Sequence, residues 1–387
     1  MALCPYFGQC GGCQTQHLEY EVQLTNKQRF VTDKLRKEGI EHPPPRIIPS
    51  NPYHYRNRMD FIFTPEGPGM RRQGRWDRMI TTRTCPISNA RINTLLAEVW
   101  TWLEKNTSEL DIFDVRAKQG TLRYAVIRCT EYTDSSSITF ILNTNSTKIT
   151  KHQELIQTFS KTTTAQNILI GLVPRDTDQS VTSDCYTIKG DVYLTETLHG
   201  KNLRYHSQAF FQNNSAMAQA MIKHAEHLLN DAGGTLLDLY GGVGTFGICL
   251  AEHFQHALII ENSAESIKAA QHNIASNNLH NTTAHLTTRP HSPQKTSHQT
   301  SKPNPSPSSP TRHAAACSPK TTSKPCLRLK PQRILYISCN PAQMAKELRH
   351  LRNYNITDLA LFDLFPQTNH IEAMALLERQ RSHTPFA

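Results

Sequence analysis

Hydrophobic and polar positions change their pattern near residue 203 of the chain. From there on, apolar strands such as TLLDLY and HALIIE take turns with amphipathic helices such as SAMAQAMIKHAEHLL and SAESIKAAQHNIASN. Ser263 is placed to cap the last of these helices, and Glu265 lies in its first turn. Such alternation predicts a parallel sheet covered by helices, so we expect an α/β, Rossmann-like domain over residues 201–387.

The first 200 residues are organised differently. Residues 1–90 hold four of the ten cysteines, a helical stretch from about Glu19 to Lys37, and the strand-like run YRNRMDFIFTPEG. Residues 91–200 begin with the helical run RINTLLAEVWTWLEK and continue with the β-rich runs LRYAVIRC, SITFILN and NILIGLV. We therefore expect an N-terminal cysteine-rich region over 1–90 and a small central α+β domain over 91–200.

The α/β pattern is interrupted from about Thr282 to Pro325. This stretch is rich in Pro, Ser, Thr and Lys and contains no carboxylate, so it offers little apolar surface to offset the entropy of ordering. We expect residues 282–325 to be disordered and the sheet to lack one strand there. The pattern resumes with QRILYIS, AQMAKELRHL and ITDLALFDLF, and we hypothesise a local reading-frame change or replacement between the two flanks.

The composition also indicates which kind of partner the protein binds. The formal net charge is +10 and the pI is near 9.1, which favours a polyanionic partner such as nucleic acid, although a merely basic protein has the same charge. No run approaches eighteen apolar residues, and no basic segment followed by an apolar one opens the chain. We expect a cytoplasmic, soluble monomer without a membrane partner, whose cysteines are thiols or metal ligands rather than disulfides.

A glycine-rich turn follows the strand TLLDLY. Gly242, Gly244 and Gly247 match G-x-G-x-x-G, and such a turn lets backbone amides and a helix start face a ligand. Glu261 ends the next strand, where a carboxylate accepts hydrogen bonds from a ribose. The pattern fits a nicotinamide-binding domain as well as a methyltransferase.

A second group of candidate residues follows later strands. Cys339 ends QRILYIS and precedes Asn340 and Pro341, so its thiol is expected above the carboxyl edge of the sheet rather than in the core. The run DLFPQTNHIEAMALLER places Asp363, His370 and Glu372 in a loop between two apolar runs. A base that acts with Cys339 is expected among these three.

The N-terminal cysteines form a third group. Cys4, Cys10 and Cys13 are spaced C-x5-C-x2-C among glycines, and Cys85 lies in the turn TCPIS. Three thiols within ten positions suit an iron–sulfur cluster or zinc, and the spacing does not distinguish the two.

Taken together, these motifs resemble the RNA uracil-5-methyltransferases, in particular the RumA and RumB type that act on 23S ribosomal RNA. The resemblance covers nearly the whole chain and rests on CPYFGQCGGCQ with CPIS, YRNRMDF, QAFFQNN, LLDLYGGVGTFG, ISCNPAQMAKEL and LFDLFPQTNHIE. It implies a Rossmann-like S-adenosylmethionine methyltransferase domain and a [4Fe-4S] cluster on Cys4, Cys10, Cys13 and Cys85. It further implies S-adenosylmethionine contacts from Gln212, Tyr240 and Glu261, with Cys339 as nucleophile and Glu372 as general base.

Two departures from the family pattern change the expectations. The chain starts at the cysteine motif, so we expect no N-terminal RNA-binding barrel, as in RumB-type members. The family also carries a D-P-P-R-like motif on a strand before S-C-N-P, and here RHAAACSP stands roughly where that motif would end. Loss of its carboxylate predicts weak binding of S-adenosylmethionine and little activity.

Other functions stay open at this point. A nicotinamide-dependent oxidoreductase leaves Cys339 and the TNHIE loop without a role. A non-catalytic RNA-binding protein on the same frame, or an enzyme acting on transfer RNA, also accounts for the motifs.

Overall fold

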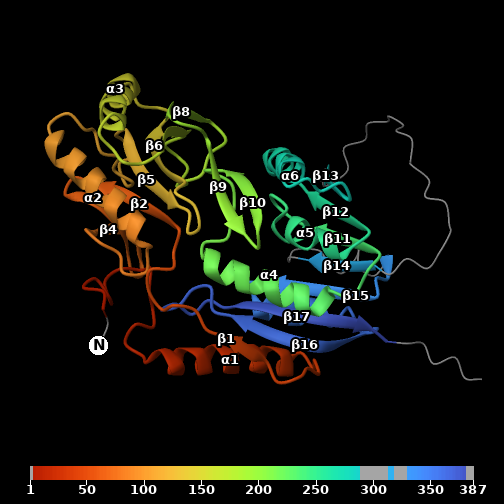
Figure 1. The fold of residues 1–387 in the computed structure, drawn as a ribbon. Coiled ribbons are helices and arrows are strands. Elements are labelled where there is room, and N and C mark those ends of the chain that lie inside the picture. Colours follow the sequence, from red (N-terminus) through yellow and green to blue (C-terminus); the bar gives the residue numbers. More distant parts are fainter. Residues whose placement is uncertain (1–2, 288–312, 318–328, 381–387) are drawn as a thin grey trace, which may run out of the picture.

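The computed structural model describes residues 3–287, 313–317 and 329–380. Figure 1 shows two lobes: one contains α2, α3 and the strands around them, and the other contains a large sheet with α1 below it and α4 above it. The β9–β10 hairpin (Tyr193–Leu198 and Lys201–His206) lies between the two lobes. No helix within the described ranges combines the length and apolar character needed to cross a membrane.

In the described part of the chain, the first lobe is built on a seven-stranded mixed sheet. Its order is β4-β3-β2-β5-β6-β7-β8, antiparallel except for β6 and β7. Helices α2 and α3 pack on one face, where Phe63, Trp102, Phe140 and Phe159 contact one another. The bounds are β2 Arg58–Thr64, β3 Gly67–Arg72, β4 Arg75–Thr81, α2 Ala90–Lys105, β5 Leu122–Cys129, β6 Ser136–Asn143, α3 Ile149–Ser160, β7 Asn167–Val173 and β8 Cys185–Lys189.

This sheet crosses the predicted division at residue 90. Strands β2 to β4 come before it and β5 to β8 after it, yet β2 pairs directly with β5, Met59 opposite Ile127. By contrast, α1 and β1 from the predicted 1–90 region pack on the second lobe. Local patterns do not show which strands far apart in the sequence will pair. For that reason the predicted boundary at residue 90 does not coincide with an edge of the sheet.

The second lobe is built on an eight-stranded sheet of described residues in the order β1-β16-β17-β15-β14-β11-β12-β13. All neighbouring strands are parallel except that β17 runs antiparallel to β15 and β16. The bounds are β1 Arg46–Ile48, β11 Thr235–Leu239, β12 His256–Glu261, β13 Thr282–Leu286, β14 His313–Cys317, β15 Arg333–Ser338, β16 Tyr354–Phe362 and β17 Glu372–Arg379.

Helices cover both faces of this sheet. On one face α1 packs with α8 through Val31, Leu35, Met344 and Leu348. On the other face α4, α5 and α6 share a core with the β9–β10 hairpin, through residues such as Met221. The bounds are α1 Tyr20–Lys37, α4 Ser215–Leu229, α5 Thr245–Cys249, the 3-10 turn η1 Ala251–His253, α6 Ala264–Ser276 and α8 Pro341–Leu348. As expected, Ser263 caps α6, since its Oγ accepts from the amide of Ser266 at 3.2 Å.

The antiparallel strand β17 departs from the predicted all-parallel sheet. Only residues 363–371 connect β16 to β17, and a parallel crossover needs a dozen residues or more. The chain therefore returns beside β16 in the opposite direction, with Phe362 opposite Glu372.

The expected missing strand and the disorder predicted for all of residues 282–325 are both wrong. Residues Thr282–Leu286 form β13 beside β12, and residues His313–Cys317 form β14 between β11 and β15. A strand needs backbone partners on both sides more than it needs β-branched side chains, so the weak pattern HAAAC can fill the sheet. The remaining residues of the segment, 288–312 and 318–325, lie outside the described part of the chain.

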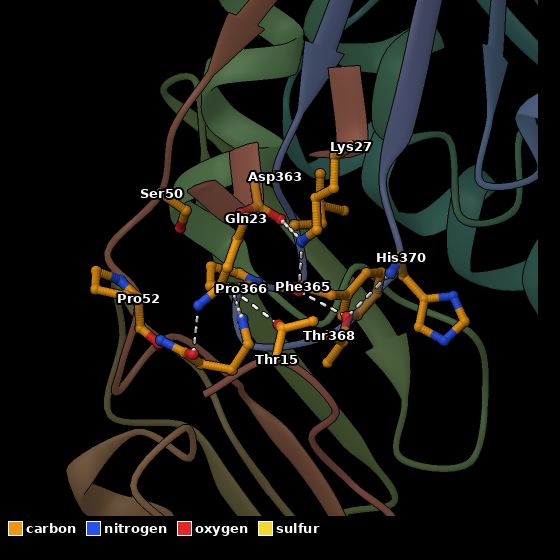
Figure 2. A network of polar contacts seen from close by, with 12 residues as sticks. Thr15, Gln23, Lys27, Ser50, Pro52, Asp363, Phe365, Pro366, Thr368 and His370 are labelled. Carbon is orange, nitrogen blue, oxygen red and sulfur yellow. Dashed lines mark hydrogen bonds and ion pairs between the residues drawn. The ribbon is translucent and has the colours of Figure 1, made fainter. Parts of the chain in front are cut away.

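A buried ion pair links α1 to the end of β16. Lys27 Nζ lies 2.6 Å from Asp363 Oδ1, and the two side chains are 4% and 0% exposed. Lys27 also donates to the carbonyl of Phe365 at 3.1 Å (Figure 2). Tyr20 donates to Asp363 Oδ2 at 3.0 Å. Burial lowers the pKa of Lys27 and raises that of Asp363, and the attraction between the two charges opposes both shifts.

Replacing Lys27 should destabilise the protein strongly. Lys27→Met leaves the Asp363 carboxyl buried without its cation, which costs about 3–5 kcal/mol in free energy of unfolding. Lys37→Met, on the exposed end of the same helix, should change stability by less than about 0.5 kcal/mol. Urea unfolding followed by circular dichroism measures both, and equal midpoints for the two variants would contradict this role of the ion pair.

Candidate active site

The candidate residues gather at one edge of the eight-stranded sheet. Strands β11, β12, β14 and β15 are parallel, so their carboxyl ends meet at that edge. Tyr240 follows β11, Glu261 ends β12, and Cys339 follows β15. Because β17 is antiparallel, its first residue, Glu372, lies at the same edge. Open α/β sheets bind their ligands there.

The glycine-rich turn after β11 has a backbone that few residues adopt. Tyr240, Gly242 and Gly244 have φ values of 61°, 58° and 89°, in the left-handed region. At Gly247 an added Cβ would lie 2.6 Å from Ile259 Cγ1 on β12, so glycine permits the close approach of α5 to the sheet. The turn is therefore shaped by its glycines as the sequence predicts.

Asp238, near the end of β11, is a site residue that the sequence analysis did not identify. Its side chain accepts a hydrogen bond from the Gly247 amide at 2.8 Å and is 4% exposed. Burial raises the pKa of Asp238 to about 6, and the charge of Glu261 adds to the rise. An acidic residue inside an apolar strand, as in TLLDLY, is the signal that could have revealed it.

Glu261 fixes the turn from the neighbouring strand. Its carboxylate accepts hydrogen bonds from the amides of Gly242 at 3.0 Å, Asn262 at 2.6 Å and Ser263 at 2.9 Å. A carboxylate has about four acceptor positions, so three are already used by the backbone.

Cys339 is exposed at the start of a helix, as predicted. Asn340 caps α8 through a hydrogen bond from the Gln343 amide to its Oδ1 at 3.1 Å, and Pro341 occupies the first turn. Ser338, fully buried, accepts from the Asn340 amide at 3.1 Å. This tight junction turns the chain sharply between β15 and α8 and directs Cys339 away from the core.

Glu372 lies beside Cys339 through the pairing of their strands. Ser338 is opposite Ala373 in the β15–β17 register, so the next residue on each strand, Cys339 and Glu372, lies at the same end of the pair, and both line one cavity. Glu372 is 8% exposed, and burial raises the pKa of its carboxyl to about 8. A carboxyl group with this pKa can exchange a proton near neutral pH.

The other two candidates of the same loop separate in space. Asp363 is buried in the ion pair with Lys27, which gives it a structural role. His370 is exposed and lines the same cavity as Glu372.

One cavity of about 910 Å³ contains most of these groups. Its lining includes Gln212, Tyr240, Asp238, Cys339 and Glu372. Glu261 is not one of the described residues that line it. A volume of this size accommodates a cofactor together with a nucleobase. The N-terminal cysteines, Cys4, Cys10, Cys13 and Cys85, line the same cavity.

The four cysteines lie near one another without forming a closed metal site. Burial raises the pKa of Cys13 to about 12, and the charges of Cys85, Cys10 and Cys4 add to the rise. The Gly12 amide donates to Cys10 Sγ at 3.4 Å. Within the described residues, no three His, Cys, Asp or Glu side chains are arranged to hold a metal ion. The thiols have the right chemistry for iron or zinc, and all four line one cavity.

The fold is that of S-adenosylmethionine-dependent methyltransferases. The solved structure of Pyrococcus abyssi tRNA (uracil-54, C5)-methyltransferase in complex with S-adenosyl-L-homocysteine matches with a TM-score of 0.76 at 23% identity, over 95% of this chain and 85% of that one. The family described as tRNA (uracil-5-)-methyltransferase matches residues 19–288 and 323–380. The chain belongs to this family of RNA uracil-5-methyltransferases.

Curated relatives agree over almost the full length. An uncharacterized RNA methyltransferase of Caldanaerobacter subterraneus is 30% identical, over 97% of this chain and 84% of its own. The tRNA (uracil(54)-C(5))-methyltransferase of Pyrococcus horikoshii is 28% identical, over 97% of this chain and 85% of its own. Membership in this family rules out the nicotinamide-dependent oxidoreductase.

The raised pKa of Glu372 predicts a pH-dependent stability. The folded protein holds this proton more tightly than the unfolded chain does, so the stabilisation is complete below the unfolded pKa of about 4.3 and is lost as pH rises through about 8. Glu372→Gln is neutral at both pH 5 and pH 9. The free energy of unfolding of this variant, relative to that of the unchanged protein, should therefore be higher at pH 9 than at pH 5. Thermal unfolding at both pH values tests this.

An exposed glutamate provides the control for that experiment. Glu41→Gln should show the same small difference from the unchanged protein at pH 5 and pH 9. A Glu372→Gln variant that behaves like Glu41→Gln would mean that the Glu372 carboxyl is not buried in solution.

Proposed function

We propose that the chain transfers a methyl group from S-adenosylmethionine to C5 of a uracil base in RNA, with Cys339 as nucleophile and Glu372 as general base. The observation that carries the proposal is the pairing of β15 with β17, which brings an exposed thiol and a buried carboxyl to one cavity. The glycine-rich turn lines the same cavity, so a bound methyl donor and a uracil base can meet there.

The proposed chemistry follows from the weak nucleophilicity of uracil C5. Cys339 as thiolate adds to C6, and the electron pair of the C5–C6 double bond becomes available at C5. S-adenosylmethionine supplies the methyl group, which C5 takes up as the bond between methyl and sulfur breaks. Glu372 then removes the C5 proton, the double bond re-forms, and the C6–sulfur bond breaks to release Cys339.

The environment of Glu372 suits that last step. A general base is most effective when its pKa is close to the working pH, and burial brings the pKa of Glu372 to about 8. The exposed thiol of Cys339 can reach a base that has left its stack, as a reaction on C6 requires.

Gln212, Tyr240 and Glu261 are proposed to hold S-adenosylmethionine. Gln212 and Tyr240 line the cavity, and the Gln212 carbonyl accepts from Asn57 Nδ2 at 2.9 Å, which fixes its segment. Glu261 holds the Gly242 amide and keeps one acceptor position for a ribose hydroxyl. The weak cofactor binding expected from the lost acidic motif stays a prediction; β14 ends in Cys317 instead of an acid.

The RNA substrate is proposed to be 23S ribosomal RNA, as the RumA and RumB resemblance implies. The Pyrococcus relatives support transfer RNA as a second candidate, since they are named for uracil 54 of tRNA. Trp76 on β4 is 65% exposed among arginines and is suited to stack on a base of either RNA.

We also propose a [4Fe-4S] cluster on Cys4, Cys10, Cys13 and Cys85. Support comes from the C-x5-C-x2-C spacing, the shared cavity wall and the mutual electrostatic effect of the thiols. A cluster would have a structural role here, because the proposed methyl transfer includes no oxidation or reduction step.

The cluster predicts a specific metal content. Anaerobically purified protein should be brown and contain about four irons per chain. Cys85→Ser should lose the colour and the iron, whereas Cys185→Ser, a half-buried cysteine outside the group, should keep both. Stoichiometric zinc without iron after anaerobic reconstitution would refute the cluster.

The nucleophile can be trapped on a modified RNA. An RNA that carries 5-fluorouracil has no C5 proton for Glu372 to remove, so the Cys339 adduct should persist as a band of retarded mobility on a denaturing gel. Cys339→Ala should form no adduct, and Cys185→Ala should form it normally. Methylation of ordinary RNA at an unchanged rate by Cys339→Ala would overturn the mechanism.

A further inference from the structure

Gln367, in the loop between β16 and β17, has a backbone that a residue with a side chain rarely adopts. Its φ is 68°, in the left-handed region, and the residue is 3% exposed. Such a conformation persists only where surrounding contacts hold it. The loop leads directly to His370 and Glu372, so these contacts bear on the active site.

Gln23 of α1 makes two of those contacts. Its Oε1 accepts from the Gln367 amide at 3.0 Å, and its Nε2 donates to Gln367 Oε1 at 2.9 Å. The remaining capacity of the Gln23 amide is used by the Thr15 hydroxyl and the Leu18 carbonyl, both at 3.0 Å. Gln23 is 2% exposed, so no water competes for these positions.

The cysteine-rich segment holds Gln367 from the other side. The amides of Gln14 and Thr15, directly after Cys13, donate to the Gln367 carbonyl at 3.0 and 3.1 Å. We call the Gln23 side chain and these two amides the Gln367 clamp. Its polar contacts around Gln23 are drawn in Figure 2.

The clamp continues into the cavity wall. Thr368, the next residue, donates from Oγ1 to the Phe365 carbonyl at 2.7 Å and accepts from the His370 amide at 3.2 Å. Figure 2 shows this path from the clamp to His370. Thr368, His370 and Glu372 line the same cavity, so the loop forms the wall beside the Glu372 carboxyl.

We propose that Gln23 is a positioning residue for Glu372: its side-chain amide fixes Gln367 and thereby holds the loop that lines the cavity together with Glu372. This inference rests on the proposed function, in which Glu372 removes the C5 proton. The pairing of Phe362 with Glu372 fixes the backbone of Glu372, but it does not fix the loop residues 363–371 that precede it. The clamp supplies that second constraint.

The order of steps gives a readout that general destabilisation would not produce. Cys339 attack and methyl transfer precede proton removal, so a displaced Glu372 slows only the release of the adduct. Gln23→Leu, tested in the full-length protein with S-adenosylmethionine and ordinary uracil-containing RNA, should accumulate a covalent RNA–protein adduct. Its breakdown should slow by about tenfold to a hundredfold, the effect of misplacing a catalytic group by roughly 1 Å.

Matched variants separate the possible outcomes. Glu372→Gln should accumulate the adduct most strongly, and Gln28→Leu, which removes a hydrogen bond from α1 to Pro45 away from the loop, should accumulate none. Gln23→Glu keeps the acceptor for the Gln367 amide and should accumulate less adduct than Gln23→Leu. If Gln23→Leu does not fold, Gln23→Glu is compared with Gln28→Leu in its place.

Two results overturn different claims. If Glu372→Gln accumulates adduct and the Gln23 variants behave like Gln28→Leu, the positioning role of Gln23 is wrong and the proposed function stands. If Glu372→Gln accumulates none and 5-fluorouracil RNA traps nothing, the proposed function itself fails.

Discussion

The antiparallel entry of β17 between β15 and β16 is the constraint on which the active site depends. Because residues 363–371 are too few for a crossover, the chain must reverse, and the start of β17 arrives at the edge where β15 ends. A thiol at the end of one strand and a carboxyl at the start of the next then face one cavity. In an all-parallel sheet, Glu372 would begin its strand at the opposite edge from Cys339.

Buried polar contacts hold the connecting loop in place. The Lys27–Asp363 pair fixes its beginning, and the Gln23 amide with the amides of Gln14 and Thr15 fixes its middle. Charges and amides buried this deeply cost free energy unless they have partners, so these contacts favour the arrangement of the loop seen here. Helix α1, distant in sequence from the methyltransferase strands, thereby becomes part of the active-site architecture.

The sequence predicted the α/β domain, the glycine turn and Cys339 at a strand end, because each produces a local pattern. Membership in the uracil-5-methyltransferase family is confirmed, while the roles of Gln212, Tyr240, Glu261 and Glu372 stay predictions. Strand β14 was not predicted because HAAAC has no strand pattern of its own. Its pairing with β11 and β15 places it in the sheet. The clamp and the Lys27 partner of Asp363 depend on contacts between distant segments, which no local pattern records, whereas the place of Asp238 inside an apolar strand was a usable signal.

The proposed function requires that this site methylates uracil at C5 through Cys339. The most direct measurement is methyl transfer from isotopically labelled S-adenosylmethionine to total RNA, followed by mass spectrometry of the nucleosides and mapping of the modified position. The unchanged protein should give labelled 5-methyluridine at a defined uridine, and Cys339→Ala should give none. Label on another atom or base, or equal 5-methyluridine with Cys339→Ala, would contradict it.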